Sequence, residues 1–453
     1  MSQIISEKTV IIIKTDWHNT SCSNCNLMKI DGYNNDKYIC NCCKIDSCNG
    51  YCDGKSCFYK RWPDDNPLNT EIILEYVFKQ QVRYIRCVDN KSMNWLPLVN
   101  STAETFVGTP GNIYISANLM SNLINATPIT DIQVVYPDYS KVDVGEGITW
   151  PAKVFAPYVD TTAWPSYDIV DNYKKTGVKF YNLGFIVAKG YTICEPSWGT
   201  YYLPDDAPIN PQIKALRALG GDVCVSFGGS SGEPLHMNAP DINTIFKQYQ
   251  LFCDAYGLTR IDFDIEGNWI DAVYANQNLN NSKALKMLQD YFKEKGKSIA
   301  IWFTLPILPT GLTADGLRIL QQAISSGVDI GGVNAMTMDY GDTAAPDPSG
   351  KMGMYGINAI TALKNQLNRL YGGTKTEAQL WAMIGTTPML GVNDITTEIF
   401  SQSDATQTLG FANQNNIGMI SMWSANRDAT GRAATGIPQI PNEFTNIFKV
   451  YTE

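Results

Sequence analysis

Three acidic residues at alternate positions, Asp262, Asp264 and Glu266, are the strongest indication of chemistry in this sequence. In an extended strand, side chains two residues apart point to the same side and lie about 6.5 Å apart. Like charges confined at that spacing repel one another, so we expect at least one carboxyl group to keep its proton near neutral pH. A carboxyl group in that state can act as a general acid. We expect Glu266 to be the acid and Asp264 to adjust its proton affinity.

Core packing and metal binding are the alternatives for these acids. A structural protein has little reason to bury three carboxylates together. A metal site would normally include histidine, and the chain has only His18 and His236. The intervening Ile261, Phe263 and Ile265 are apolar and are expected to face the helices. Acid catalysis therefore fits the pattern best, and no metal is expected at the three acids.

Eight short apolar runs after residue 150 predict the elements that position these acids. Patterns of helical period lie between the runs, and strands that alternate with helices predict parallel βα units. Eight such units predict an α/β fold, a (β/α)8 or TIM barrel. A doubly wound open sheet would usually carry a glycine-rich phosphate loop after its first strand, and none is present there. The expected strands are 154–159, 180–188, 222–227, 260–266, 298–304, 332–339, 380–385 and 418–423.

In such a barrel the chemistry takes place at the C-terminal ends of the strands. The expected ends of strands one, three, four, six and eight carry polar, ionisable or aromatic residues. Besides the three acids, these include Tyr158, Asp160, Ser226, Gly228, Gly229, Met338, Asp339, Tyr340 and Trp423.

Four stretches resemble motifs of glycoside hydrolase family 18. Residues 256–266 resemble its strand-four signature DGxDxDxE, 225–229 its SxGG motif, and 336–340 its strand-six Met-x-Tyr-Asp region. Trp423 matches the tryptophan beneath the family's central sugar subsite. The resemblance covers residues 150–440 and is greatest to bacterial chitinases of the chitinase D type. It implies the same barrel fold.

The resemblance implies that β-1,4 bonds of N-acetylglucosamine polymers such as chitin are cleaved by a substrate-assisted retaining mechanism. Glu266 would protonate the glycosidic oxygen, and the substrate's N-acetyl carbonyl would attack the anomeric carbon. Asp264, next to Asp262, would stabilise the resulting oxazolinium ion, while Asp339 and Tyr340 would lie at the acetamido group. No cofactor is implied. The substrate-binding residues implied are Trp423, Ser226, Gly228, Gly229, Met338, Trp269 and Tyr158.

The sequence departs from the family pattern at three positions. Thr259 stands in place of the first Asp of the strand-four signature and Arg260 in place of its Gly. The missing Asp normally shares charge with Asp262, so its loss is expected to shift the pH optimum while the acid stays in place. Met338 replaces a tyrosine whose hydroxyl would hold the acetamido group. Chitinase D sequences share this change, so we do not read it as inactivation.

Aromatic residues near the expected strand ends are candidates for stacking on sugar faces. Trp302 and Trp381 lie within expected strands and are interpreted as core. The interval 386–418 has room for one helix, too little for the α+β lobe that many family members insert there. We therefore expect a shallow, open cleft that favours internal cleavage. The stacking candidates are Trp164, Trp198, Tyr201, Tyr202 and Trp269.

Cysteines are concentrated in the N-terminal third of the chain. Eight of the 12 cysteines lie between Cys22 and Cys57. Disulfides or intermolecular cross-links would suit so dense a cluster. The pairs Cys22/Cys25 and Cys40/Cys43 also approach a four-thiolate zinc spacing. Free thiols are the third alternative. A segment this polar cannot bury enough apolar surface to fold without such links.

We expect three regions: a Cys-rich segment over 1–60, a small mixed or β-rich module over 61–148, and the barrel over 149–453. In the module, 71–79 has the pattern of a short helix or a buried strand. Strands are expected at 81–88, 111–116 and 131–137.

Composition excludes some classes of partner. The formal net charge of -9 gives no affinity for nucleic acid or for an anionic membrane surface. No run of 18 apolar residues predicts a membrane span. The first 30 residues lack a secretory pattern. We nevertheless expect an extracellular, surface or particle-associated location, with a cytoplasmic one left open.

Two other functions compete with chitin hydrolysis. The same acids would serve an endo-β-N-acetylglucosaminidase that acts on glycoproteins. Alternatively, the barrel would bind glycan as a coat or assembly protein that is cross-linked through its cysteines. The intact Glu266 argues against a pure lectin, because lectins of this family typically lose that acid.

Overall fold

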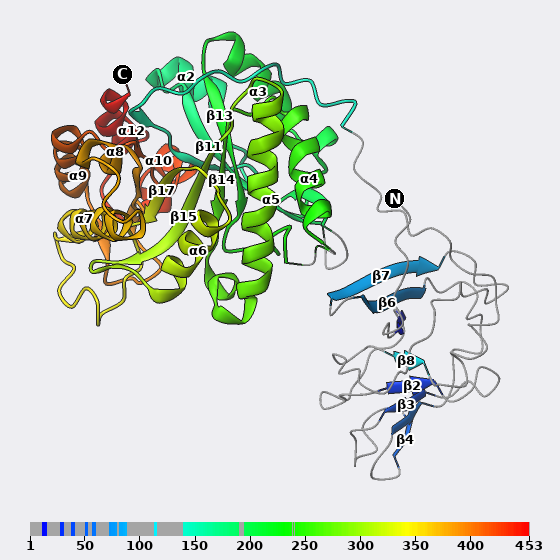
Figure 1. Cartoon of the computed structure of the whole chain (residues 1–453). Coiled ribbons are helices and arrows are strands. Elements are labelled where there is room, and N and C mark those ends of the chain that lie inside the picture. Colours follow the sequence, from blue (N-terminus) through cyan, green and yellow to red (C-terminus); the bar gives the residue numbers. More distant parts are fainter. Residues whose placement is uncertain are drawn as a thin grey trace. The chain divides into compact units, whose positions relative to one another are not determined.

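The computed structural model describes residues 139–189, 194–237, 239 and 241–452, together with the backbones of eight short strands nearer the N-terminus. The chain divides into two units, Met1–Val135 and Tyr136–Glu453, which are described separately (Figure 1).

The first unit contains an eight-stranded sheet in the order β4-β5-β3-β2-β8-β1-β6-β7. Its longest pair is the antiparallel hairpin of β6 and β7, in which Ile72 lies opposite Cys87 and Phe78 opposite Gln81. The run 71–79 is therefore a strand, and the strands expected at 81–88 and 111–116 are present; 131–137 and the cysteine side chains lie outside the described residues. The strands are β1 (Ile11–Thr15), β2 (Met28–Ile30), β3 (Tyr38–Cys40), β4 (Gly50–Cys52), β5 (Cys57–Tyr59), β6 (Ile72–Phe78), β7 (Gln81–Cys87) and β8 (Ile113–Ile115).

The second unit is the expected (β/α)8 barrel. Its first strand is interrupted at Ala156–Pro157, so that β9 pairs with the last strand, β21, and β10 pairs with β11; this closes the barrel. The other neighbouring strands are parallel. The barrel strands are β9 (Val154–Phe155), β10 (Tyr158–Asp160), β11 (Phe180–Ala188), β13 (Asp222–Gly228), β14 (Arg260–Asp264), β15 (Ala300–Leu308), β17 (Ile330–Met336), β18 (Ile384–Thr387) and β21 (Met419–Ile420).

Helices alternate with these strands and cover the outside of the barrel (Figure 1). Several begin at a side-chain cap: Asp241 accepts from the backbone of Thr244 at the start of α4, and Ser401 forms a capping box with Asp404 at the start of α9. The helices are α2 (Ile169–Thr176), α3 (Asn210–Ala218), α4 (Ile242–Ala255), α5 (Ala275–Glu294), α6 (Ala314–Ser325), α7 (Met352–Leu370), α8 (Glu377–Ala382), α9 (Gln402–Asn415), α10 (Ala425–Thr430), α11 (Arg432–Thr435) and α12 (Glu443–Phe448). None of the helices in the described part of the chain is long and apolar enough to cross a membrane.

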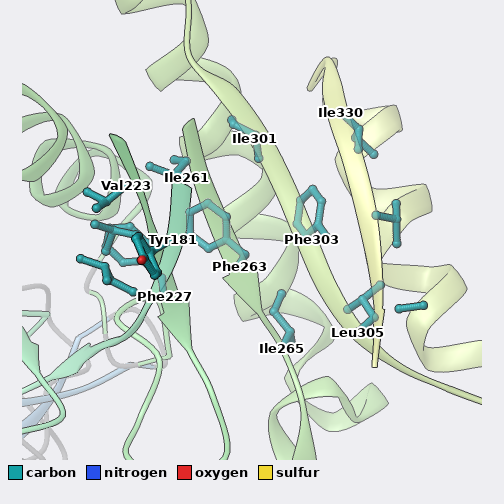
Figure 2. Packing of buried hydrophobic residues seen from close by; sticks show 14 of the residues in the cluster. Tyr181, Val223, Phe227, Ile261, Phe263, Ile265, Ile301, Phe303, Leu305 and Ile330 are labelled. Atoms are coloured by element: carbon teal, nitrogen blue, oxygen red, sulfur yellow. The ribbon is translucent and has the colours of Figure 1, made fainter. Parts of the chain in front are cut away.

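The main hydrophobic core lies between the barrel strands and these helices. Ile261, Phe263 and Ile265 are buried in it, as expected from their alternation with the acids. The ring of Phe263 stacks on Phe227 of β13 at 5.3 Å (Figure 2). Tyr249 of α4 packs edge-on against Phe263 at 5.2 Å. These contacts fix β14 in register, so its inward side chains have a defined position.

Some strand bounds differ from the prediction. Residues 377–382 form helix α8 because Thr376 and Gln379 make a capping box, so the seventh strand begins only at Ile384. The sixth strand ends at Met336, before Asp339. Between the last two strands lie the expected helix α9 and also a small hairpin, β19 (Gly391–Val392) and β20 (Ile399–Phe400). The interval is therefore more structured than one helix.

Candidate active site

The three acids lie along one line at the C-terminal end of β14. Asp262 and Asp264 are inside the barrel and almost fully buried, at 3% and 4% exposure, and Glu266 follows just beyond the strand. Neighbouring β13 comes close enough that a Cβ on Gly228 would lie 2.1 Å from the carbonyl oxygen of Asp264. Gly228 also has a φ of 109°, which glycine adopts most readily. Gly228 thus allows the backbones of β13 and β14 to pack closely, and it does not contact the pocket.

Asp262 is the centre of a hydrogen-bond network in the middle of the barrel. Its Oδ2 accepts from the hydroxyls of Tyr158 at 2.8 Å and Ser226 at 2.6 Å, and its Oδ1 accepts from Thr304 at 2.8 Å. Burial raises the pKa of Asp262, and these three hydrogen bonds act against that rise. Four strands meet in this network, so the position of Asp262 is firmly defined. Ser226 is fully buried beneath the pocket, which differs from its expected contact with substrate.

Asp264 and Glu266 have a different environment. The Oδ1 atom of Asp264 has no hydrogen-bond partner among the described residues. Burial raises the pKa of Asp264 well above its usual range, and the charges of Glu266 and Asp262 raise it further. The pKa of Glu266 is raised to about 7, first by burial and then by Asp339 and Asp394. Near neutral pH, therefore, Glu266 is close to half-protonated, and Asp264 holds a proton more tightly than an exposed aspartate does.

Both acids face a cavity of about 110 Å³ at this end of the barrel. Of the residues expected in the site, Tyr158, Met338, Asp339 and Trp423 also line it. Several further lining residues were not anticipated from the sequence. These are Phe185, Ser230, Thr304, Met336, Thr387, Met389 and Asp394.

An aromatic cluster forms one wall of the cavity. Trp423 stacks with Phe185 at 5.7 Å and lies 6.1 Å from Tyr158, and Phe185 stacks with Tyr158 at 6.0 Å. A Cβ on Gly229 would lie 2.8 Å from the ring of Phe185, so this glycine makes room for the ring instead of contacting the cavity itself. Such an aromatic wall beside two carboxyl groups suits the apolar face of a sugar ring.

The loop after β17 carries Asp339 into the cavity. Asp339 has a φ of 50° and its Oδ1 accepts from the backbone of Ile395 at 2.8 Å. The buried carboxylate of Glu398 accepts from the backbones of Tyr340 and Gly341, at 3.1 and 2.7 Å. The hairpin of β19 and β20 therefore holds this loop in place. The sequence contained little signal for this role, because these contacts join positions more than 50 residues apart.

Several expected contacts differ in the structure. Tyr340 does not line the cavity; it is buried in the core, 6.2 Å from Tyr355 of α7. Trp269 packs on Tyr274 at 5.2 Å and is also absent from the cavity lining. Trp198 is not a stacking platform, because it is 1% exposed and donates to the Tyr256 hydroxyl at 3.1 Å.

The other aromatic residues considered from the sequence differ in how exposed their side chains are. Trp164 and Tyr201 are highly exposed, at 92% and 75%, and Tyr202 is less exposed. Trp302 and Trp381 are buried, as expected.

No group of three or more potential metal ligands occurs among the described residues. His236 is buried and bonds to Asn278 at 2.9 Å. The cysteines considered for zinc, Cys22, Cys25, Cys40 and Cys43, have side chains outside the described residues.

Comparison with known proteins identifies relatives of the barrel. No family model matches the chain. Over 288 residues, 62% of this chain, it is 41% identical to the probable bifunctional chitinase/lysozyme of Escherichia coli (strain K12), and it covers 32% of that protein. Over 284 residues it is 42% identical to Endochitinase 11 of Metarhizium anisopliae, of which it covers 53%. The chain thus spans only part of the length of these curated relatives.

Two solved structures match the barrel over almost their whole length. The catalytic domain of the hyperthermophilic chitinase from Pyrococcus furiosus is 30% identical with a TM-score of 0.59, over 68% of this chain and 97% of that domain. Catalytic-site mutants of active domain 2 of the thermostable chitinase from Pyrococcus furiosus, complexed with chito-oligosaccharides, are 29% identical with the same TM-score, over 67% of this chain and 96% of theirs. Together with the barrel and its ladder of acids, these relatives show that the chain belongs to the chitinases of glycoside hydrolase family 18.

Proposed function

We propose that this chain hydrolyses β-1,4 bonds between N-acetylglucosamine units of chitin, with retention at the anomeric carbon. The observation that carries the proposal is the pairing of Asp264, with its unpartnered oxygen, and Glu266 at one cavity with an aromatic wall. The names of the relatives, which include an endochitinase and chitinase mutants complexed with chito-oligosaccharides, support the same substrate class.

Glu266 is the proposed general acid. A carboxyl group with a pKa of about 7 is protonated in a large fraction of molecules near neutral pH and can give its proton to the glycosidic oxygen. As the leaving sugar departs, the N-acetyl oxygen of the same substrate bonds to the anomeric carbon and forms an oxazolinium ion. Glu266, now ionised, then takes a proton from water as that water opens the ring.

Asp264 and Asp339 are proposed to hold the acetamido group for this attack. The free oxygen of Asp264 can accept the amide N–H, and the carboxyl group can stabilise the positive charge that develops there. Asp339 approaches from the loop after β17, two strands from β14, and Ile395 and Glu398 hold that loop in place. Trp423 would support the sugar ring from below. The family's tyrosine hydroxyl is absent, since Met338 occupies its position in the cavity lining.

The proposal is tested with three matched tetrasaccharides, of N-acetylglucosamine, glucosamine and glucose. Only the first has an acetamido carbonyl, so only the first should be cleaved, and its initial product should be the β-anomer by NMR. Internal cleavage of longer oligomers would yield dimers and trimers early. Cleavage of the glucose oligomer, or inversion of the anomer, would contradict the substrate-assisted mechanism. Release of glycan from a high-mannose glycoprotein without oligomer cleavage would favour the endo-β-N-acetylglucosaminidase alternative.

The pH dependence should follow the protonation of Glu266. Because the acid must be protonated, kcat/KM is expected to fall above about pH 7, tenfold per pH unit. Asp394→Asn removes one of the negative charges that raise this pKa, so its alkaline limb should move to lower pH. Asp342→Asn is the matched control, because Asp342 bonds to the exposed Thr397 on the same hairpin, at 3.0 Å. Coincident profiles for wild type and Asp394→Asn would count against this role of Asp394.

A further inference from the structure

The floor of the barrel holds a buried cation that the proposed mechanism does not use. Arg260 begins β14, two residues before Asp262, and is 5% exposed. Its guanidinium carbon lies 3.9 Å from the centre of the Trp302 ring and 4.6 Å from that of Trp150, so the group is sandwiched between two indoles. Trp302 can fill the barrel interior only because Gly332 faces it, where a Cβ would lie 2.4 Å from the ring.

This guanidinium has no carboxylate as a hydrogen-bond partner among the described residues. One terminal nitrogen contacts the Met419 sulfur at 3.2 Å, and Nε has no partner. Asp222 lies near the same end of the barrel, but it pairs with Arg217 at 2.8 Å and accepts from the indole of Trp150 at 3.1 Å. Burying a cation without a bonded counterion costs free energy. The burial of Arg260 therefore indicates an anionic group that it stabilises from a longer distance.

The groups that face Arg260 from the neighbouring strands identify that charge. Cys224 of β13 and Tyr158 of β10 interact with it, but burial raises the pKa of both well above the usual range, so both are neutral. Asp262 is on the same inward face of β14, about 6.5 Å away along the strand. Of the three groups that act on Arg260, Asp262 is the carboxyl group.

Other charges near this end of the barrel are already paired. A cavity of about 610 Å³ outside the two indoles is lined by Glu146, Asp254 and Lys297, among others. Glu146 lies 3.4 Å from Lys297, and Asp254 lies 3.5 Å from Lys295. These groups are largely exposed, so water screens their effect on the buried guanidinium.

We propose that Arg260 is a positioning residue whose buried guanidinium keeps Asp262 ionised, so that the proton of the Asp262–Asp264 pair resides on Asp264, beside the substrate. Asp262 is suited to the ionised form, since three hydroxyls donate to it. Asp264 is suited to the protonated form, since its Oδ1 has no donor among the described residues. The inference rests on the proposed function, because it concerns the acid that would stabilise the oxazolinium ion.

The test compares Arg260→Met, which keeps an unbranched chain between the indoles without charge, with Arg260→Lys, which keeps the charge. Protonation of Asp262 should remove activity at low pH. Without the cation this protonation occurs at higher pH, so the acidic limb of kcat/KM should move up by about one pH unit in Arg260→Met. Arg260→Lys should stay near the wild-type profile. An unchanged limb in Arg260→Met, whatever its activity, would overturn the proposal.

A second measurement does not require turnover. A carboxyl group whose pKa is raised by folding stabilises the protein at low pH, and that stability is lost as the pH rises through the folded-state pKa. Burial raises the pKa of Asp262 in the folded protein, and loss of the Arg260 charge raises it further. Tm of Arg260→Met should therefore fall relative to wild type as the pH rises from 4 to 8. If wild type cleaves no chitin oligomer, the proposed function fails while this measurement still decides the role of Arg260. If Arg260→Met does not fold, Arg260→Gln is compared with Arg260→Lys in the same two measurements.

Discussion

Replacing Glu266 with Gln should lower kcat on N-acetylglucosamine oligomers by about 10²- to 10⁴-fold and leave oligomer binding nearly intact. Gln has the same shape but cannot donate the acid's proton or act as base toward water, which is the loss expected for a general acid. Calorimetric titration with the tetramer should give a Kd within about threefold of the wild-type KM, provided that chemistry limits turnover.

A matched control is available for this substitution. Glu233 also has a pKa raised to about 7 by burial, but it is not among the residues that line the cavity. Glu233→Gln should therefore keep most of the wild-type kcat. If Glu266→Gln retained more than a tenth of the wild-type kcat, another group would have to be the acid. If neither wild type nor Glu266→Gln turned over the oligomers but both bound them, a glycan-binding coat protein would become the better interpretation.

The second large effect is expected for Asp264→Asn. An asparagine can occupy the same space and accept the acetamido N–H, but it cannot release a proton and so cannot become negatively charged as the oxazolinium ion forms. Electrostatic stabilisation of this kind usually contributes about 10² to 10³ in kcat. The loss should appear in kcat more than in KM, because it concerns charge that develops only during the reaction.

Thermal stability separates this loss of activity from misfolding. Burial, Glu266 and Asp262 raise the pKa of Asp264 above its value in the unfolded chain. The wild-type protein therefore loses stability as the pH rises toward the folded-state pKa, whereas asparagine does not titrate. Tm of Asp264→Asn should equal or exceed that of wild type at neutral pH, with a difference that grows as the pH rises. A lower Tm at every pH would mean that Asp264 has a mainly structural role.

The sequence by itself determined the barrel and the direction of its acids. Strand period is two, so the alternation of Asp262, Asp264 and Glu266 with Ile261, Phe263 and Ile265 fixed which set faces inward once the run was recognised as a strand. The apolar runs also located the eight barrel strands, because strand and helix patterns differ in period. The prediction failed at α8, where Thr376 and Gln379 form a cap that extends helix into a run read as strand.

Tertiary structure decided which residues share the cavity with those acids. Phe185 and Asp394 reach it from β11 and from the β19–β20 hairpin, and no local pattern marks them. Tyr340 follows Asp339 directly, yet the positive φ of Asp339 and the hydrogen bond that the Tyr340 N–H donates to Glu398 turn Tyr340 into the core. Side-chain direction in a loop depends on such long-range contacts and not on period, which is why the strand pattern predicts that the acids face inward but does not predict the direction of Tyr340.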